Sequence, residues 1–491
     1  MSGIPYAGQS SALLNRARSA TPFTSQDGQP CASVPGEGGS RHVYPLRSAD
    51  FRDWLICEFV TVYEAPPSQD AFRAVLRTLE ARAAHAEYPP QKLDYRVGFE
   101  GDPFAPSKII LDLANAQGHV LEIDAHGWRV RENFDHPCRQ SLTTLPLPAP
   151  TLPPADGSAP AMGALDRFAE LFSLSALDCA AISAWLVNAL RPKGPYPILV
   201  LEGRPCSGKT LLARALHFLL DPSPALTRRL PDEDREMLRL AYEHWILAFD
   251  DIHRVPLKMS DALCALSQGA ALRLRQADSR DALEFQIARP MILIVPYDES
   301  NPGWTPPRAL SNRTVTVRRL PIQRMRPESA IWSDFQALHP SLLAQLAQAA
   351  ATALRRIREV EVPNVARFPD AAMWSAAAAP ALGLTEQIAI DALSDPATAW
   401  LGSDPLRDAL HTLLPPNGNW TGDATELLNR LRAVAPHAAL PTTPKGLSQA
   451  LPGVPGFRIE RGRTYEGERA LSITRIADTD HTAAAGHMYK S

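Results

Sequence analysis

The chain has 491 residues, of which 45% are hydrophobic and 21% are charged, so it can bury a sizeable core and is not a disordered chain. Its formal net charge of -3 gives no indication of nucleic-acid binding, which would have to come from local basic patches. Six scattered cysteines without a CxxC pair predict free thiols in a reducing compartment. No secretory signal or membrane span is evident in the sequence, so we expect a cytoplasmic protein with no membrane partner.

The first part of the chain predicts a tail followed by a small α+β module. Residues 1–40 are rich in Ser, Gly and Pro and are expected to form a disordered tail. Residues 41–135 contain two stretches with apolar residues at helical spacing, Phe51–Phe59 and Phe72–Ala84. Short strands are expected after them, at Lys108–Leu113, Val120–Ile123 and Trp128–Val130. A Pro-rich linker over residues 136–160 is expected to stay extended.

The strongest functional motif begins at Gly203. Residues Gly203–Thr210 fit the pattern GxxxxGK[ST], between a predicted buried strand at Ile198–Leu201 and an apolar helix at Leu211–Leu220. Glycines let the backbone bend so that N–H groups point at phosphate oxygens, and the helix N-terminus adds partial positive charge. We therefore predict a site for ATP and Mg²⁺, in which Lys209 reaches the β- and γ-phosphates and Thr210 ligates the metal. The predicted nucleotide-binding residues are Gly203, Arg204, Pro205, Cys206, Ser207, Gly208, Lys209 and Thr210.

A second motif supplies the carboxylates that such a site needs. The apolar run Trp245–Phe249 predicts a buried strand, and it ends in Asp250 and Asp251. A carboxylate at the end of a strand beside the phosphate loop can hold the Mg²⁺ shell, and the next acid can polarise the attacking water. We assign the metal to Asp250 and the water to Asp251. Alone, this motif would indicate only a strand end with solvated carboxylates.

Together these residues resemble a known family. The segments Leu199–Leu220, Trp245–Gln268 and Arg289–Val295 are similar to the ATPase core of helicase-like proteins from prophages and integrative elements. That family is related to the superfamily 3 and primase-linked helicases of the AAA+ class. The most specific pieces here are Ala248–Asp251, Ser260–Cys264, Arg289–Leu293 and Ser311–Arg313.

The resemblance implies an α/β P-loop NTPase fold of AAA+-like type, with an N-terminal α+β module and a C-terminal helical plus winged-helix region. In this chain the ATPase core with its preceding helices would cover residues 161–330. A helical region would follow at residues 331–415, a winged-helix domain at residues 416–480 and a tail at residues 481–491. The N-terminal module stands where the family carries or replaces a primase-type domain, and it shows no cluster of acids for two metals.

The resemblance also implies a catalytic arginine and therefore a ring. Arg313 stands where such ATPases carry an arginine finger, which reaches the γ-phosphate bound by a neighbouring subunit. A finger that acts in trans requires a homo-oligomer, which we expect to be a hexameric ring. Arg318 and Arg319 are rival candidates, and a surface arginine leading into the strand Thr314–Val317 is the simpler interpretation of Arg313.

Two further features of the family concern DNA and the sensing of ATP. Ala271–Arg275 and Leu283–Ile287 can pair as a hairpin, which related helicases point into the pore to grip a single strand of DNA. Arg273, Arg275 and Arg280 are the predicted contacts, unless the hairpin is an ordinary one with solvated arginines. The family usually has an Asn at the end of the next strand, whereas Met291–Val295 has none. Asp298 or Ser300 are the possible substitutes, and the departure puts turnover in question.

The end of the chain predicts a winged helix. Asp423–Ala433 and Thr443–Leu451 read as helices, and two strands with a turn between them follow, over Phe457–Thr464 and Arg469–Ile476. In a DNA-binding winged helix the second helix enters a groove and the wing contacts phosphates. Lys445, Arg461 and Arg463 are the predicted DNA contacts, although many winged helices bind proteins instead.

These features combine into one functional prediction with one alternative. We expect an ATP-dependent DNA helicase or translocase of a phage or other mobile element, which hydrolyses Mg-ATP in a ring to move on DNA during replication. The alternative is a nucleotide-switched regulator or assembly factor with slow turnover that acts on protein partners. The missing Asn favours the alternative, and the arginines of the hairpin and the winged helix favour the helicase.

Overall fold

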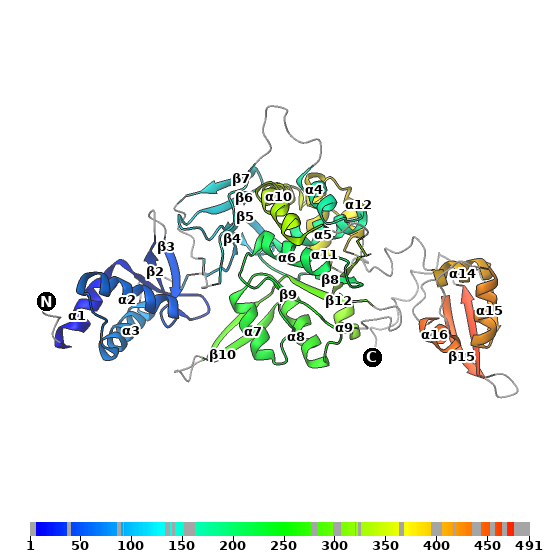
Figure 1. The fold of residues 1–491 in the computed structure, drawn as a ribbon, viewed down its shortest axis with the longest axis horizontal. Coiled ribbons are helices and arrows are strands. Elements are labelled where there is room, and N and C mark those ends of the chain that lie inside the picture. Colours follow the sequence, from blue (N-terminus) through cyan, green and yellow to red (C-terminus); the bar gives the residue numbers. More distant parts are fainter. Residues whose placement is uncertain are drawn as a thin grey trace, which may run out of the picture. The chain divides into compact units, whose positions relative to one another are not determined.

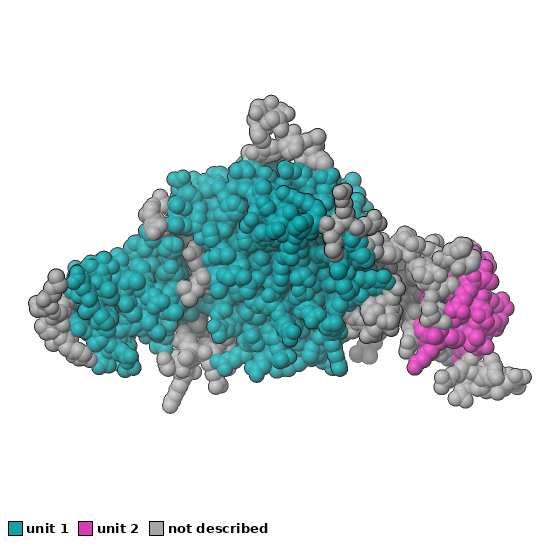
Figure 2. All heavy atoms as spheres, in the orientation of Figure 1, with its two compact units in different colours: residues 1–395 teal, residues 396–491 magenta. Residues whose placement is uncertain are grey.

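The computed structural model divides the chain into two compact units, residues 1–395 and 396–491 (Figure 2). Among the helices that it describes, none is both long enough and apolar enough to cross a membrane. The described residues are 6–36, 41–85, 90–91, 93–132, 138–139, 143–151, 163–275, 282–297, 306–319, 321–322, 326–362, 368–393, 405–415, 418–434, 443–451, 457–463 and 469–475.

The first unit begins with a small helical and β subdomain (Figure 1). Its helices are α1 (Tyr6–Arg16), α2 (Ala49–Tyr63) and α3 (Gln69–Ala84), and its antiparallel sheet has the order β1 (Thr21–Thr24), β2 (Pro30–Pro35), β3 (Arg41–Pro45). Leu13 of α1 and Val34 of β2 are fully buried in one core with Leu55 of α2 and Leu79 of α3. The prediction of a disordered tail over residues 1–40 was therefore wrong, because few but well-spaced apolar residues of this segment complete the core of the helices that follow.

A second, antiparallel sheet follows, with the order β4 (Val97–Asp102), β5 (Ala105–Asp112), β6 (Val120–Asp124), β7 (Gly127–Arg131). Ile109 and Leu121 lie in the same buried cluster as Leu342 of the long helix α10 (Glu328–Arg356). This sheet is therefore packed into the core of the following region and does not belong to a separate N-terminal module as predicted. Sequence periodicity located β5, β6 and β7 but missed β4, which is interrupted by Gly98 and Gly101.

The segment predicted as an extended linker is partly packed. The N–H of Leu147 donates to the carbonyl of Leu113 at 2.8 Å, and the N–H of Thr151 donates to the carbonyl of Pro340 at 3.2 Å. Leu147 is also buried in the main core. Residues 143–151 thus lie against the sheet and the helices as a fixed strap, whereas residues 152–162 are outside the described part of the chain.

A four-stranded parallel sheet forms the centre of the first unit, in the order β13 (Thr314–Arg319), β8 (Ile198–Gly203), β12 (Met291–Pro296), β9 (Leu247–Phe249). Alternate residues of β8 belong to two different cores: Leu199 and Leu201 to one, Ile198 and Val200 to the other. Because side chains of a strand alternate between the two faces, helices must cover the sheet on both sides. The result is the α/β architecture that was predicted.

The two faces have different coverings. The buried cluster that contains Leu199 also contains residues of α4 (Ala164–Leu171), α5 (Ala176–Ala189), α6 (Lys209–Leu220), α10, α11 (Pro369–Ala378) and α12 (Glu386–Asp391). The face with Ile198 packs against α7 (Asp234–Glu243), α8 (Leu257–Gln268) and the short α9 (Arg308–Ser311). Helix α10 begins at Glu328, three residues before the expected start of the helical region at residue 331, and it continues through Pro340.

The predicted hairpin is present in the first unit. Strands β10 (Ala270–Arg275) and β11 (Ala282–Ile287) pair antiparallel, with Arg273 opposite Glu284 and Arg275 opposite Ala282. The hairpin lies in the chain between α8 and β12, so its base is attached directly to a central strand of the parallel sheet.

The second unit has its own core. Its helices are α14 (Pro405–Leu413), α15 (Ala424–Val434) and α16 (Pro444–Ala450), and its antiparallel sheet has the order β14 (Asn419–Gly422), β16 (Arg469–Arg475), β15 (Phe457–Arg463). Leu410 of α14 is buried with Leu427 of α15 and Ile473 of β16. The two helices and the strand hairpin expected at this end are present, but the unit also includes α14, which the sequence assigned to the preceding helical region.

Candidate nucleotide site

The predicted phosphate loop joins β8 to α6, so the expected strand and helix on either side of it are confirmed. Gly208 caps the helix with φ 71°, a left-handed conformation that favours glycine. A Cβ built on Gly203 would come within 2.8 Å of the carbonyl oxygen of Arg319, and one on Gly208 within 2.8 Å of a methyl carbon of Ile322. A larger residue at position 203 would clash with backbone, and one at position 208 would be strained by the left-handed φ. Cys206 also has a positive φ, 63°, so the loop turns sharply at this residue.

The loop presents groups that suit a phosphate. The side chain of Ser207 is fully buried, and its hydroxyl has no hydrogen-bond partner among the described residues, which is costly for a buried polar group unless a ligand satisfies it. Lys209 Nζ makes one long contact, 3.4 Å, to the carbonyl of Arg204, and Thr210 lies in the first turn of α6. The backbone cradle, the buried hydroxyl, the ammonium group and the helix N-terminus together fit the phosphates of ATP.

The predicted acidic residues end β9 at the same edge of the sheet as the phosphate loop. Strand β12 lies between β8 and β9, which places them about 10 Å apart across the sheet. Asp250 is half-buried and Asp251 is exposed, with φ 60°. The N–H of Asp251 donates to Asp250 Oδ1 at 2.8 Å, and Asp251 Oδ1 lies 2.9 Å from Nε2 of His253. A carboxylate and a threonine hydroxyl facing bound phosphates are oxygen ligands of the type that Mg²⁺ prefers.

A short edge segment holds Asp250 in place. Arg228 pairs with Phe249 as a parallel bridge. The N–H of Arg228 donates to the carbonyl of Ala248 at 3.0 Å, and the N–H of Asp250 donates to the carbonyl of Arg228 at 2.7 Å. The acidic end of β9 is thus fixed on both sides, by β12 and by this segment.

The end of β12, where the related helicases carry a polar residue, lies beside the phosphate loop. Pro296 is level with Gly203, and the N–H of Tyr297 donates to the carbonyl of Gly203 at 3.0 Å. Ile294 and Val295 are fully buried. The half-buried Tyr297 is therefore the first residue after the strand with a polar side chain, and sequence reasoning did not consider it. The two suggested substitutes, Asp298 and Ser300, lie outside the described residues.

The three candidate arginines have different environments. Arg313 precedes β13, and its carbonyl accepts the N–H of Ile198, the first residue of β8, so it lies at the edge of the sheet opposite the phosphate loop. Six strand residues correspond to about 20 Å, so Arg313 cannot reach the loop of its own subunit. Its Nη1 donates to the carbonyl of Ala309 at 2.7 Å. Arg318 pairs with the buried carboxylate of Glu202 at 2.9 Å, and the buried Arg319 donates to the carbonyls of Phe172 and Ser173.

The predicted DNA contacts are only partly described. Arg273 and Arg275 lie on β10, whereas Arg280 is outside the described residues. In the second unit, Lys445 is exposed in the first turn of α16, and Arg461 and Arg463 lie on β15 opposite Leu471 and Arg469. The structure therefore places these residues on the expected hairpins and helix.

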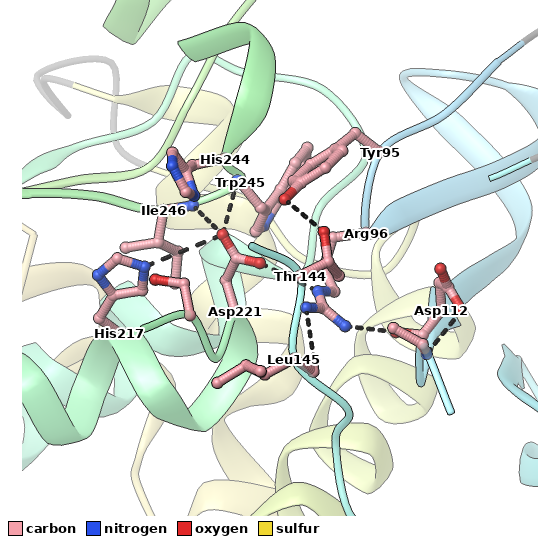
Figure 3. Close-up of polar contacts among 12 residues, drawn as sticks. Tyr95, Arg96, Asp112, Thr144, Leu145, His217, Asp221, His244, Trp245 and Ile246 are labelled. Atoms are coloured by element: carbon pink, nitrogen blue, oxygen red, sulfur yellow. Dashed lines mark hydrogen bonds and ion pairs between the residues drawn. The ribbon is translucent and has the colours of Figure 1, made fainter. Parts of the chain in front are cut away.

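A buried polar cluster at the C-terminal end of α6 was missed by sequence reasoning (Figure 3). At the end of α6, Asp221 forms an ion pair with Arg96 at 3.0 Å, with side chains that are 1% and 0% exposed. Asp221 Oδ2 also accepts the N–H groups of Trp245 and Ile246, at 2.7 and 3.1 Å. One carboxylate thus joins the C-terminus of the phosphate-loop helix to the residues that begin β9. These residues are far apart in sequence, so no local pattern could have revealed the contact.

Histidines line the same cluster and remain neutral. Burial lowers the pKa of His217 to about 4 and the pKa of His244 to about 4. His217 Nδ1 lies 2.5 Å from the carbonyl of Leu226, and His244 Nε2 lies 2.9 Å from Nη2 of Arg228, which requires an unprotonated Nε2. Burial likewise lowers the pKa of His339 to about 4. The three buried imidazoles therefore titrate below the usual range for histidine.

We expect the stability of the first unit to fall as the pH is lowered from about 6.5 to about 4. In that window the histidines bind protons in the unfolded state but stay neutral in the folded state. Each histidine therefore lowers the free energy of unfolding by about 1.4 kcal/mol per pH unit. Urea unfolding at several pH values measures the slope. The variant His339→Gln should flatten it, whereas replacement of the exposed His126 by Gln should not. A free energy of unfolding that stays constant across this window would contradict the prediction.

Comparisons with known proteins gave a match to one family over part of the chain and similarities to solved structures. No curated protein matches the sequence. Among solved structures, the C-terminal region of NrS-1 aligns over 96% of this chain and 99% of its own, at 9% identity and a TM-score of 0.36. The active helicase "SCCmec type IV Cch" aligns over 93% of each chain, at 12% identity and a TM-score of 0.41. The JCV helicase aligns over 45% of this chain and 71% of its own, at 15% identity and a TM-score of 0.23.

The sequence itself matches one protein family over part of the chain. The matching segment begins in α4 and ends just after α12, so it contains the parallel sheet, the phosphate loop and the acidic end of β9. Residues 165–397, slightly under half of the chain, match the family of the actinomycete integrative conjugative element replication protein.

Proposed function

We propose that the protein is an ATP-dependent DNA helicase or translocase that serves the replication of an integrative element. The observation that carries this proposal is the shared edge of the parallel sheet, where the glycine-bounded loop Gly203–Thr210 and the acidic end of β9 lie on either side of β12. The buried hydroxyl of Ser207, which has no partner among the described residues, supports a phosphate in this loop. The match of residues 165–397 to a replication-protein family supports the biological setting.

Each residue of the site has a distinct role in the proposal. The backbone N–H groups of Arg204 and Cys206–Gly208 and the ammonium group of Lys209 bind the β- and γ-phosphates. Thr210 and Asp250 hold Mg²⁺, which would neutralise charge that develops on the phosphates. Asp251 orients the attacking water, and its contact with His253 at 2.9 Å keeps the carboxylate at the mouth of the site.

The position of Arg313 supports a ring. Since it lies at the edge of the sheet opposite its own phosphate loop, it could act on ATP only in a neighbouring subunit. Arg319 is buried against backbone carbonyls and Arg318 is paired with Glu202, so neither is as well placed for that role. We therefore propose a homo-oligomeric ring, with six subunits as the expected number, in which Arg313 stabilises the γ-phosphate across the interface.

Mixing two inactive variants tests the role of Arg313. Lys209→Ala and Arg313→Ala are each expected to be inactive, but subunits mixed before assembly should regain part of the ATPase activity. Recovery is expected because some interfaces would combine an intact Lys209 with an intact Arg313. A mixture of Lys209→Ala and Asp250→Ala is the matched control, because both changes lie in the same subunit's site and should not recover. Failure of the first mixture to exceed the control would remove Arg313 from the mechanism.

DNA would contact the protein at two places. In the ring, the β10–β11 hairpin would carry Arg273, Arg275 and Arg280 to a single strand in the pore. In the second unit, Lys445 on α16 and Arg461 and Arg463 on β15 would contact phosphates. Movement of the subunits on ATP cleavage would then draw the hairpin along the strand.

The rate of ATP hydrolysis with and without single-stranded DNA tests the proposed function. We expect single-stranded DNA to stimulate hydrolysis, and we expect no stimulation in a Lys209→Ala blank. Unwinding of a forked duplex would follow from the same preparation. Slow hydrolysis that is indifferent to DNA, with tight ATP binding, would contradict the motor.

One observation favours a second candidate, a nucleotide-switched regulator that acts on protein partners. The end of β12 beside Gly203 is apolar, because Ile294 and Val295 are fully buried, so a polar sensor of the γ-phosphate is missing from the strand itself. Tyr297, which follows immediately, is the group to test. If Tyr297→Phe lowers ATP turnover without weakening ATP binding, its hydroxyl compensates for the missing sensor and the motor is favoured.

A further inference from the structure

A cavity of about 460 Å³ lies in the first unit, away from the phosphate loop. Its walls come from the β1–β2 turn, the start of β4, Arg139, the end of α7 and the base of the β10–β11 hairpin. Trp245 and Arg289, which line it, precede β9 and β12, so the cavity is at the amino-terminal edge of the parallel sheet. The candidate nucleotide site is at the opposite edge. A ligand in this cavity would therefore be distinct from ATP in the loop.

Two buried guanidinium groups give the cavity its chemistry. Arg139 is 9% exposed and Arg289 is 7% exposed. Within the described part of the chain, neither has a carboxylate within ion-pair distance. Arg289 donates through Nε to the carbonyls of Ala241 and His244 and through Nη1 to the carbonyl of Ala288, which leaves Nη2 without a partner among the described residues. Among the described residues, the side chain of Arg139 donates only through Nη2, to the carbonyl of Tyr242.

The two arginines are close enough for the positive charge of each to destabilise that of the other. The guanidinium of Arg139 lies 3.3 Å from the centre of the Tyr242 ring and 5.4 Å from that of Tyr95. The guanidinium of Arg289 lies 6.0 Å from the same Tyr95 ring and 5.0 Å from Trp245. Burial and then the charge of Arg139 lower the pKa of Arg289 to about 10. An anion between the two guanidinium groups would offset their mutual repulsion. It would also accept hydrogen bonds from their remaining N–H donors.

The remaining lining residues narrow the class of anion. Lys193 adds a third cation at the rim, where its ammonium group lies 4.0 Å from the Phe104 ring centre, while Asp27 and Asp94 add two acids. Three cations and two acids leave a small positive charge, which suits one phosphate group better than several phosphates in a row. The acids can instead accept N–H groups of a base, and the volume is in the range of a small-molecule site and exceeds the size of a phosphate alone. A nucleotide combines these features.

We propose that this cavity binds one nucleotide unit, with its phosphate between Arg139 and Arg289. The nucleotide is either free or part of a single strand, and the phosphate chemistry is shared by both. Because Gln286 and Ala288 at the base of the hairpin line the same cavity as Asp27 and Tyr95, the bound nucleotide joins the hairpin to the N-terminal part of the unit. This site does not depend on ATP hydrolysis at the phosphate loop.

Binding measured in the full chain with Lys209→Ala, which disables the phosphate loop, tests the proposal. The probes are 5′-AMP and a (dT)₂₀ oligonucleotide, titrated calorimetrically. We expect at least one probe to bind, and Arg139→Gln to weaken that binding by about 10- to 100-fold, since a charge-assisted hydrogen bond is lost. Arg73→Gln, which changes an exposed arginine of α3, is the matched control and should bind as before.

The pattern of results separates the two sources of the nucleotide. If AMP binds and its binding is weakened by Arg139→Gln, the site takes a free nucleotide. If only binding of the oligonucleotide is weakened by that change, the site takes one nucleotide of a strand. Thermal unfolding shows whether Arg139→Gln is folded, and Lys193→Gln at the rim is a second variant that should weaken binding to a smaller degree. The proposal is overturned if neither probe binds at millimolar concentration, or if binding is unchanged in both Arg139→Gln and Lys193→Gln.

Discussion

Replacement of Lys209 by alanine is expected to lower the rate of ATP hydrolysis by about a hundredfold to a thousandfold, the usual cost of removing a preorganised charge from a developing negative charge. The reason is local. Lys209 begins α6 directly after the loop, and its only hydrogen bond in the described structure is a 3.4 Å contact to the carbonyl of Arg204. The ammonium group is therefore available to a ligand and is not engaged in holding the fold. Steady-state release of phosphate measures the effect.

The same reasoning predicts that Lys209→Ala leaves stability unchanged. The thermal midpoint of the variant should match that of the unaltered protein to within a few degrees, since surface changes typically alter stability by less than about 0.5 kcal/mol. Lys258→Ala is the matched control. Lys258 is an exposed lysine of α8, and its Nζ lies 3.3 Å from the carboxylate of Asp234 on α7. If Lys258→Ala lowered hydrolysis as strongly as Lys209→Ala, the site would be misplaced.

The replacement Arg96→Met is expected to destabilise the first unit by about 3–5 kcal/mol, because it leaves the carboxylate of Asp221 buried without its counter-charge. Arg96 makes three contacts that methionine cannot replace: to Asp221 at 3.0 Å, to the carbonyl of Asp112 at 3.1 Å and to the carbonyl of Leu145 at 3.0 Å. Urea unfolding followed by far-ultraviolet circular dichroism measures the loss. The double variant Arg96→Met, Asp221→Asn should recover part of it, since the unpaired charge is then removed as well.

An exposed ion pair provides the comparison for the buried one. Arg239 and Glu243 lie one turn apart on α7 at 2.9 Å, and their side chains are 74% and 36% exposed. Arg239→Met should change the free energy of unfolding by less than about 0.5 kcal/mol, as is usual for such pairs. Equal effects of the two arginine replacements would show that burial of the Arg96–Asp221 pair does not decide its contribution.

The features that the sequence predicted well are those that depend on residues close together in the chain. The loop at Gly203–Thr210, the apolar strand before it and the helix after it occupy one continuous segment, and the structure has them in that order. The β10–β11 hairpin and the helices α15 and α16 were likewise visible from local periodicity and turn residues. The match of residues 165–397 to a replication-protein family agrees with the resemblance to helicase-like proteins found in the same segment.

The features that the sequence did not predict depend on contacts between distant residues. Nothing near Leu13 or Val34 indicates that α2 and α3 supply the other half of their core, so a polar segment was mistaken for a disordered tail. Leu147 lies in a Pro-rich stretch, and only its contact with Leu113 shows that the stretch is fixed. Asp221, 125 positions from Arg96, illustrates the same limit for the polar cluster.

The shared core of the antiparallel sheet and the parallel sheet determines where the chain can be cut. Ile109, Leu121 and Leu147 are buried against α10, so a fragment that starts at the family boundary, residue 165, would lose them and expose the apolar face of that helix to water. It would also lose Arg96 and leave Asp221 unpaired. The smallest piece of the first unit that can be produced as an independent, soluble protein therefore has to begin upstream of β4, well before the part by which the family is recognised.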